Sequence, residues 1–402
     1  FRRLLRRRAT TNIVKLIDKT HPADLALLFR YFNDVEQDEI FSALKESETT
    51  AEFLSELDES IAIRLLENES PERIAQILEK ASSNEQAYLM GLVDEKYANS
   101  VIDLLKAEKQ EELEEMMAYP EDSAGILMYT DVFTLHEDTK AKDAIYALQD
   151  QEGAEMVFYL YTLDNDGRLT GVISLRDLVT TTGDTMLKDI MSKQIHVVRP
   201  ETDQEEVARI VSQYNFLAVP VVDSEERLLG IVTVDDVVDV IREEATEDFL
   251  QLVGAGKDRE ILLKSSWENA RMRVPWLFAS WVGGILAALI IGIFDDVLKS
   301  TIALAAFIPV IMGMGGNIGT QSSTMIVRGL ATGRVSLENS VKILFKEIRV
   351  GLILGILYGL LLGVVAIFQF IDVSPMIGVV VGLSICISMI IAATIGSLVP
   401  LI

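Results

Sequence analysis

The chain has 402 residues, of which half are hydrophobic, 61 are acidic and 36 are basic, for a net charge of −25. This length allows several domains, and so acidic a chain repels nucleic acid, which we exclude as a partner. There are three histidines and one cysteine, Cys386, and no nucleophile–base pair or phosphate-binding loop is present. The composition therefore argues against an enzyme, a disulfide framework and a site for soft metals.

The charge is divided unevenly along the chain. After Leu262 there are six acids and nine bases, so 55 acids and 27 bases lie in the first 262 residues. We expect this acidic half to attract cations and to repel anionic lipid. No cleavable signal peptide precedes it, and we therefore expect it in the cytoplasm.

The first 128 residues are predicted to form an acidic all-helical domain. From His21 to Met117, apolar residues recur three and four positions apart, which is typical of helices. His21–Ala26 and Ser70–Ala75 look like one repeated unit, with a proline at the start of each helix, where proline is tolerated. Short antiparallel helix pairs stacked as a small solenoid would produce this pattern.

An internal repeat follows in residues 129–249. Arg168–Val179 matches Arg227–Val238, and a helix pattern and a strand-like run precede each copy. Each unit, 129–186 and 187–249, reads β-α-β-β-α. This pattern resembles a tandem of cystathionine-β-synthase-type (CBS) domains, which are usually regulatory.

The resemblance to CBS domains implies a nucleotide contact. In that family a Ser/Thr-x-x-Asp pattern contacts the ribose of an adenine nucleotide. The candidate ATP contacts are Ser174, Asp177, Thr233 and Asp236. Residues of these types also cap helices that follow strands, so a purely structural role is the alternative.

Residues 275–402 are predicted to form a membrane domain. Four apolar segments are each long enough to cross about 30 Å of hydrocarbon. They are Pro275–Phe294, Thr301–Met325, Val350–Phe370 and Met376–Ile402. Lysine and arginine gather before the first segment and between the second and third. The positive-inside rule therefore places that loop and the soluble half in the cytoplasm.

Residues 250–274 join the soluble half to the membrane domain. Asp258–Met272 is amphipathic, and we expect a connecting helix beneath the pore, with a passive linker as the alternative.

In the third apolar segment, glycine recurs at every fourth position from Gly351 to Gly363. Such a stripe predicts close packing of this helix against another.

The second apolar segment carries the candidate pore. Within Ala305–Gly333, polar residues follow a proline and several glycines at a depth where lipid is expected. Polar side chains there are costly unless they face protein or water, so they usually line a path. The glycines allow close helix contact, which is the alternative reading, or free carbonyl oxygens to face a pore. The candidate pore residues are Pro309, Gly313, Gly316, Asn317, Gly319, Thr320 and Gln321.

Three motifs carry a resemblance that covers nearly the whole chain. They are the glycine-rich run Gly313–Gln321, the YPEDSAG box at Tyr119–Gly125 and the acidic segment Val234–Asp248. With the order of the domains, they resemble the MgtE magnesium-channel family. The fold class is then a multidomain membrane protein with an all-α helical-repeat N-terminal domain, α/β tandem CBS domains and an α-helical transmembrane domain.

The resemblance implies a homodimer in the lipid bilayer of the cytoplasmic membrane that imports Mg²⁺ through a pore on its two-fold axis. The family has five membrane helices in each subunit, so we expect a fifth after Ile402. Mg²⁺ gives up its water reluctantly, so amides, hydroxyls and freed glycine carbonyls would contact the hydrated ion. Many members have asparagine where this chain has the shorter Thr320.

Two other functions fit the same pattern. One is a broad carrier or exchanger for Co²⁺, Ni²⁺ or Mn²⁺ that adenine nucleotide regulates through the CBS pair. The other is a sensory module in which the CBS pair reads ATP and the membrane part is an anchor. Ion flux through the purified protein would separate all three.

The resemblance also implies a cytosolic Mg²⁺ sensor. Its ions bridge acidic side chains of the helical domain, the CBS pair and the connecting helix, and this bridging closes the pore. The matching acids are Glu52, Asp203, Glu205, Asp236, Asp239, Glu244, Glu247 and Asp248. Asn84, Tyr88 and Asn215 stand where the family has acids, so we expect weaker feedback in this chain.

Overall fold

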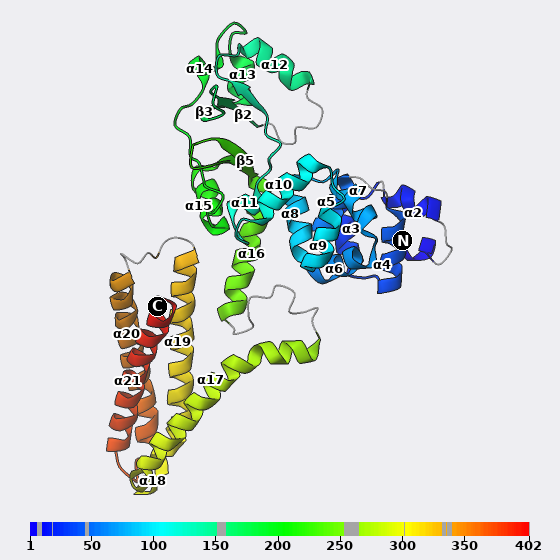
Figure 1. Cartoon of the computed structure of the whole chain (residues 1–402). Coiled ribbons are helices and arrows are strands. Elements are labelled where there is room, and N and C mark those ends of the chain that lie inside the picture. The colour runs from blue at the N-terminus through cyan, green and yellow to red at the C-terminus, as the bar shows by residue number, and fades with distance from the viewer. Residues whose placement is uncertain are drawn as a thin grey trace. The chain divides into compact units, whose positions relative to one another are not determined.

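The computed structural model describes residues 1–5, 10–17, 19–44, 48–150, 158–252, 265–300, 302–331, 335 and 340–401. These residues form two compact units, Phe1–Glu244 and Ala245–Ile402. The first unit contains the helical domain and both CBS units, and the second contains the long apolar helices (Figure 1).

Short helices make up the N-terminal part of the first unit, which confirms the predicted helical domain. Pro22 and Pro71 are each the first residue of a helix, and the side chains of His21 and Ser70 cap these helices. The helices are α1 (Arg2–Leu5), α2 (Thr10–Ile17), α3 (Pro22–Phe29), α4 (Asp34–Ala43), α5 (Glu48–Ser55), α6 (Glu59–Asn68), α7 (Pro71–Leu78), α8 (Ser83–Leu92), α9 (Glu95–Ile102), α10 (Ala107–Met117) and α11 (Ala124–Leu127).

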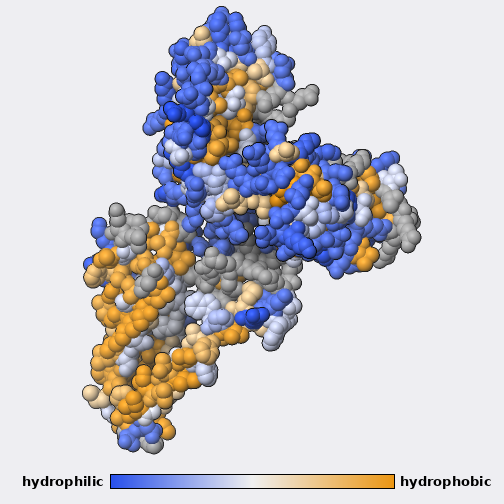
Figure 2. All heavy atoms as spheres, in the orientation of Figure 1, coloured by the Kyte–Doolittle hydropathy of each residue, from blue (hydrophilic) through white to orange (hydrophobic). Residues whose placement is uncertain are grey.

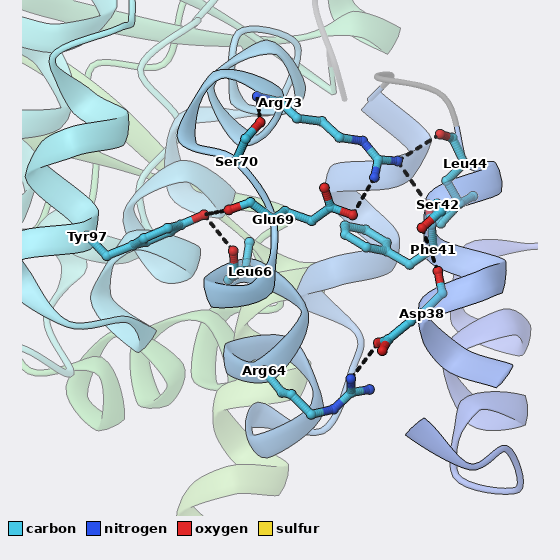
Figure 3. A network of polar contacts seen from close by, with 10 residues as sticks. All are labelled: Asp38, Phe41, Ser42, Leu44, Arg64, Leu66, Glu69, Ser70, Arg73 and Tyr97. Atoms are coloured by element: carbon cyan, nitrogen blue, oxygen red, sulfur yellow. Dashed lines mark hydrogen bonds and ion pairs between the residues drawn. The ribbon is translucent and has the colours of Figure 1, made fainter. Parts of the chain in front are cut away.

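Arg73 ties neighbouring helices of this domain together (Figure 3). Its guanidinium pairs with Glu69 at 2.6 Å and donates to the carbonyl oxygens of Phe41 and Leu44 at 2.9 and 3.0 Å. These carbonyls lie at the end of α4, where a helix leaves its last carbonyls without partners. Tyr97 on α9 donates to the Glu69 carbonyl at 3.2 Å. Polar contacts as well as apolar packing therefore hold the helices in register.

The CBS pair has the predicted order of elements with one difference. The first unit contains β1 (Thr134–His136), α12 (Ala141–Asp150), β2 (Tyr159–Leu163), β3 (Leu169–Ser174) and α13 (Leu175–Thr180), and α14 (Leu187–Ile190) leads to the second unit. The second contains α15 (Gln204–Tyr214), β4 (Ala218–Val222), β5 (Leu228–Thr233) and α16 (Val234–Leu252). Its first strand is reduced to one parallel bridge between Val198 and Val221. Pro200 and Pro220 lack the N–H groups that would extend this bridge in either direction.

One hydrophobic core runs through the helical domain and the second CBS unit. It contains Leu89 and Met116 from the helical domain together with Val207 and Val232 from the second CBS unit, and each is almost fully buried. The first CBS unit has a separate core around Leu160. Of the two CBS units, the second therefore shares its packing with the helical domain.

Among the described residues of the second unit, four helices are long and apolar enough to cross a membrane, as the sequence predicts. The spans cover Ser266–Ile293, Ile302–Leu330, Ser340–Gln369 and Met376–Leu401. The elements are α17 (Ser266–Ile293), α18 (Asp295–Ser300), the 3₁₀ helix η1 (Ile302–Phe307), α19 (Ile308–Ala331), α20 (Ser340–Gln369), α21 (Met376–Leu398) and η2 (Val399–Leu401). Figure 2 shows hydrophobic residues over the surface of these helices and mainly hydrophilic residues over the first unit.

The predicted glycine stripe on α20 packs against α21. A Cβ added at Gly359 would lie 2.6 Å from the carbonyl oxygen of Gly382, and one at Gly363 would lie 2.9 Å from that of Gly378. Real Cβ atoms essentially never approach so closely, so only glycine allows this distance between the helices. The two helices therefore form the packed centre of the second unit.

Residues 253–264, which include much of the predicted connecting helix, lie outside the described residues. From Ser266 onward, α17 continues through Pro275 into the first span without a break. Ser265 and Glu268 form a capping box at its start. The last part of the predicted connecting segment and the first span are thus one helix.

Candidate cation path and regulatory interface

Helix α19 has two contrasting faces. One face packs within the unit and is buried at Gly315, Ile318, Ser322 and Ile326. The opposite face is exposed at Gly313, Gly316, Asn317, Thr320, Gln321 and Thr324. Both sets recur at helical spacing, so each defines one side of the helix. We call the second set the open polar face, and it contains five of the seven candidate pore residues.

The glycines of α19 divide between these two faces. A Cβ at Gly315 would meet the Ser388 hydroxyl at 2.9 Å, and one at Gly319 would contact Ala392 at 3.5 Å. Both glycines therefore pack against α21. A Cβ at Gly313 or Gly316 would have nothing within 4 Å among the described residues. Gly319 thus belongs to the packed side of the helix.

Helix α19 is continuous from Ile308 to Ala331, which corrects the expectation that its glycines free carbonyl oxygens for a pore. The glycine carbonyls remain inside a regular helix, where backbone groups bond to one another. Pro309 is the second residue of α19 and follows η1, a position where a missing N–H costs little. Any polar path along this helix must therefore be lined by amide and hydroxyl side chains.

Glu347 is a polar residue of the membrane unit that sequence reasoning did not single out. The hydroxyl of Ser322, which is only 2% exposed, donates to the Glu347 carboxylate at 3.0 Å. This contact joins the packed face of α19 to α20. Glu347 lies between the bases Lys346 and Arg349, just before the predicted span Val350–Phe370, so the sequence pattern did not mark it as a membrane-embedded acid.

Asp236, at the start of α16, is held from two sides. The Nδ2 of Asn84 on α8 donates to its Oδ1 at 2.9 Å, and the Thr233 hydroxyl donates to its Oδ2. Burial of the carboxyl group raises the pKa of Asp236 to about 6, although the Thr233 hydrogen bonds oppose this shift. The Oδ1 of Asn84 is buried without a hydrogen-bond partner among the described residues. The helical domain therefore covers this corner of the second CBS unit.

Acidic groups meet at another point between the helical domain and α16. Burial, then the nearby carboxylates of Asp239 and Glu52, raise the pKa of Glu56 above its usual value, while Arg242 and His21 oppose the shift. Glu52 and Asp239 were predicted sensor residues, and Glu56 was missed. Its position four residues after Glu52 was the signal, because residues at that spacing share one side of a helix.

The other predicted sensor acids are dispersed. Asp203 caps α15 and accepts a hydrogen bond from the Glu205 N–H at 2.8 Å. Glu244 accepts a hydrogen bond from the buried amide of Gln204 at 2.6 Å. Burial and the neighbouring Glu247 raise the pKa of Asp248. Within the described residues, no three Asp, Glu, His or Cys side chains form a group that could hold a metal, so the sensor stays a prediction.

The YPEDSAG box connects the helical domain to the start of α15. The backbone N–H of Gly125 donates to the Pro200 carbonyl at 2.9 Å, and that of Gln204 donates to the Asp122 carbonyl at 2.9 Å. A Cβ at Gly125 would lie 2.4 Å from the ring of Tyr119. This motif is therefore a structural clamp between the helical domain and the second CBS unit.

The two candidate nucleotide corners share local geometry but not accessibility. In the first CBS unit, the Ser174 hydroxyl donates to the Asp177 carboxylate at 2.6 Å and accepts from the Asp177 N–H at 3.1 Å. Asp177 is exposed. In the second unit, Thr233 is 2% exposed and Asn84 covers Asp236. Of the two corners, only the first is open within this unit.

Two of the three positions that depart from the family pattern have clear structural roles. Asn215 is the C-cap of α15 and has a φ of 55°, a left-handed conformation that asparagine tolerates better than most residues. Tyr88 packs against the core that joins the helical domain and the second CBS unit. Neither position needs a metal to explain its residue.

Comparison with known families accounts for nearly the whole chain. The model of the MgtE intracellular N domain matches residues 20–122, the CBS model matches 124–182 and 187–243, and the MgtE divalent cation transporter model matches 308–402. The magnesium transporter MgtE of Bacillus subtilis (strain 168) is 31% identical over 400 residues, which cover 99% of this chain and 88% of the relative. The chain belongs to the MgtE family of magnesium transporters. This membership confirms the predicted family and fold class.

Other MgtE proteins agree with this assignment. The magnesium transporter MgtE of Thermus thermophilus is 39% identical over 311 residues, which cover 76% of this chain and 68% of the relative. The solved soluble part of a magnesium transporter is 29% identical with a TM-score of 0.55, and covers 60% of this chain and 96% of the solved one. The cytosolic domain of the Mg²⁺ channel MgtE, solved in complex with ATP, is 35% identical with a TM-score of 0.57. The match covers 60% of this chain and 98% of the solved one.

Family membership confirms two further predictions. The chain is a membrane protein whose helical and CBS parts are cytosolic. It belongs to a family of transporters that are not enzymes.

Proposed function

We propose that this MgtE protein is a homodimeric Mg²⁺ channel whose ion path follows the open polar face of α19. The observation that carries this proposal is the array of Asn317, Thr320, Gln321 and Thr324 on one exposed side of a membrane helix. Amide and hydroxyl groups facing hydrocarbon would each cost several kcal/mol, so this face requires water or protein beside it. A water-filled path provides that environment.

A second copy of the chain would complete this path. Among the described residues of α17 none is buried, and Trp276, Leu277 and Trp281 are each at least 58% exposed. Gly313 and Gly316 leave open space beside α19. Two copies that face each other across α19 would enclose the polar residues and would leave the apolar surface for lipid.

The chemistry of this face suits a hydrated magnesium ion. Mg²⁺ keeps several of its waters, and neutral oxygen groups can bind those waters without stripping them. Asn317 and Gln321 offer amide groups, and Thr320 offers a hydroxyl. The exposed side chains of α19 include no carboxylate, which suits rapid passage better than tight binding.

Regulation is proposed to act through the acidic interface of Glu52, Glu56 and Asp239. Burial raises the pKa of Glu56, and the nearby carboxylates of Asp239 and Glu52 raise it further, as expected for ionised groups that repel one another. Carboxylate oxygens are the ligands that Mg²⁺ prefers, and when bound there it would supply positive charge that offsets this repulsion. High cytosolic Mg²⁺ would then favour docking of the helical domain and a closed pore, and the predicted acids Asp203, Glu205, Glu244, Glu247 and Asp248 remain further candidates.

Adenine nucleotide is proposed to act at the first CBS corner. Ser174 and Asp177 offer an exposed hydroxyl–carboxylate pair that can bind ribose hydroxyls. The related solved cytosolic domain of MgtE contains ATP, which favours this assignment. Thr233 and Asp236 bind each other, and Asp236 also binds Asn84, so we do not propose Thr233 and Asp236 as nucleotide contacts.

The ion path is tested by Mg²⁺ flux through the purified protein in liposomes. Gly316→Leu and the double variant Asn317→Leu with Gln321→Leu should insert normally and abolish flux. Among the residues that the structure describes, a Cβ at Gly316 has nothing within 4 Å, so loss of flux would point to the path. Wild-type flux in both variants would refute the proposed path.

Two control variants separate blockage from misfolding. Met312→Leu changes an exposed apolar residue of the same helix and should retain flux. Gly319→Leu would force a larger side chain against Ala392 and should disturb helix packing, which would be visible as lower thermal stability. Gly316→Leu should be as stable as Met312→Leu. It should resemble Gly319→Leu only in its loss of flux.

The second candidate function is a broad divalent transporter, which the description of the matching membrane family as divalent cation transporters favours. The same liposomes distinguish the two functions. Flux of Co²⁺ equal to that of Mg²⁺ would support broad transport, whereas a clear preference for Mg²⁺ would support the channel proposed above.

A further inference from the structure

The contact between Asn84 and Asp236 joins the first turn of α8 to the first turn of α16, 152 residues later in the chain. Each oxygen of the Asp236 carboxylate has a donor, because Asn84 binds Oδ1 and Thr233 binds Oδ2. Next to it, the Ser83 hydroxyl accepts from the Thr130 N–H at 3.1 Å. Direct hydrogen bonds therefore dock the first turn of α8 on the CBS part.

This arrangement does not fit a metal ion held between positions 84 and 236. An ion between two side chains needs oxygen ligands from both of them. Asn84 instead presents its N–H₂ group, a donor with partial positive charge, to the carboxylate at 2.9 Å. The amide nitrogen thus takes the place beside the carboxylate that a bridging ion would need.

We propose that Asn84 is a metal-independent latch, which keeps the helical domain docked on the second CBS unit at this point whether or not Mg²⁺ is present. The proposal rests on the proposed function in one respect, that docking of the helical domain regulates the pore. It divides the interface into a latch end at Asn84 and Asp236 and an acidic end at Glu56 and Asp239. Only the acidic end is cation-sensitive.

The latch changes the expected effect of losing an acid at position 84. Two carboxylates at positions 84 and 236 would repel and would need a cation between them. An amide and a carboxylate attract each other without one, because a hydrogen bond to a charged group is among the stronger kinds. Asparagine at this position therefore favours the docked state at low Mg²⁺.

Amide hydrogen exchange of the full chain in detergent micelles tests the latch, with chelator or with saturating Mg²⁺. Peptides that cover Ser83–Leu92 and Met128–Phe133 report the latch end, and the latter contains the Thr130 N–H that binds Ser83. Peptides from β2 and β3 in the separate core of the first CBS unit are the internal reference. The variants are Asn84→Asp and Asn84→Leu. Asn99→Asp, at an exposed position on α9, is the matched charge control.

The expected results differ for each protein. Wild type and Asn99→Asp should exchange equally slowly at the latch end with chelator and with Mg²⁺. Asn84→Asp should exchange about tenfold faster or more in chelator, as expected for loss of one charge-assisted hydrogen bond, and should recover in Mg²⁺. Asn84→Leu should exchange faster in both conditions, because it removes the donor without adding a charge.

Two results would overturn the latch. The first is that wild type loses as much protection in chelator as Asn84→Asp does. The second is that Asn84→Leu keeps the protection of wild type. If a variant unfolds, the reference peptides would reveal it. In that case the comparison of wild type with chelator and with Mg²⁺ decides alone. Failure of the proposed function is distinguishable, because absent Mg²⁺ flux, or an acidic end that ignores Mg²⁺, would leave the protected latch unchanged.

Discussion

The two CBS units carry the same short motif in different surroundings. Ser174 and Asp177 form a hydroxyl–carboxylate pair at an exposed corner of the first unit. Thr233 and Asp236 form the equivalent pair in the second unit, but Asn84 of the helical domain binds this aspartate and partly covers it. The repeat thus determines the same strand-to-helix corner twice, and the neighbouring domain decides which corner remains available to a ligand.

The glycines at equivalent positions of the repeat also differ in how tightly their surroundings are constrained, and the second unit is again the more constrained. A Cβ at Gly171 would meet the side chain of Met191, at 2.4 Å from its sulfur. A Cβ at Gly230 would lie 2.5 Å from the backbone carbonyl oxygen of Tyr129. A methionine side chain can move, whereas this carbonyl bonds to the Ile231 N–H at 2.9 Å. The second unit is therefore more tightly constrained than the first.

The largest contrast is expected between Gly230→Ala and Gly171→Ala. Gly230→Ala should destabilise its unit by about 3 kcal/mol, the upper end of overpacking costs, because backbone must shift. Gly171→Ala should cost about 1 kcal/mol, since Met191 can change rotamer. Hydrogen exchange in the β4–β5 and β2–β3 hairpins of the full chain measures both effects. Equal costs would show that the difference in constraint is not real.

Nucleotide binding should separate the two aspartates. Asp177→Ala should weaken ATP binding by about tenfold to a hundredfold, the effect of losing hydrogen bonds from a charged group. Asp236→Ala should leave ATP affinity unchanged, because this side chain already binds Thr233 and Asn84. Calorimetric titration of the full chain with ATP measures both variants. Weaker binding in Asp236→Ala alone would reverse the comparison.

Removal of each hydroxyl provides a smaller contrast. Thr233→Val should cost about 2 kcal/mol, because a buried carboxylate loses a donor. Ser174→Ala should cost about 1 kcal/mol, the usual loss of a helix N-cap. Local hydrogen exchange at the starts of α16 and α13 would measure these costs. A larger cost for Ser174→Ala would mean that burial of the second corner does not strengthen its hydrogen bonds.

The smallest expected effect is on pH dependence. Burial raises the pKa of Asp236 to about 6, so the folded state binds a proton more readily than the unfolded chain. The contribution of Asp236 to the stability of the folded state is therefore fully present below the ordinary pKa of an aspartate. It is lost as the pH rises through about 6. Lowering the pH from about 7 to about 5 should stabilise the second corner by on the order of 1 kcal/mol. Local exchange in Asp236→Asn should lack this component, and an identical pH profile in that variant would contradict the assignment.

Several features of this protein follow from its sequence alone. Four spans could be predicted because a chain that crosses lipid must satisfy its backbone within a helix, which requires about twenty apolar residues. Strand β4 (Ala218–Val222) is the strand-like run that precedes the second copy of the repeat, and it could be predicted because its pattern is local. The starts of α3 and α7 at Pro22 and Pro71 follow from the fixed backbone angle of proline. Each of these features depends on residues close together in the chain.

Other features could be decided only by the tertiary structure. The sequence suggested that glycine carbonyls of α19 face a pore, but this helix is continuous, and packing against α21 separates Gly319 from the open polar face. Glu56 became a candidate only when folding placed it near Asp239. Asn84 looked like a lost metal ligand until its amide was found beside Asp236, 152 residues away. Local pattern cannot predict such contacts, because the energy of a polar side chain depends on which distant groups the fold places beside it.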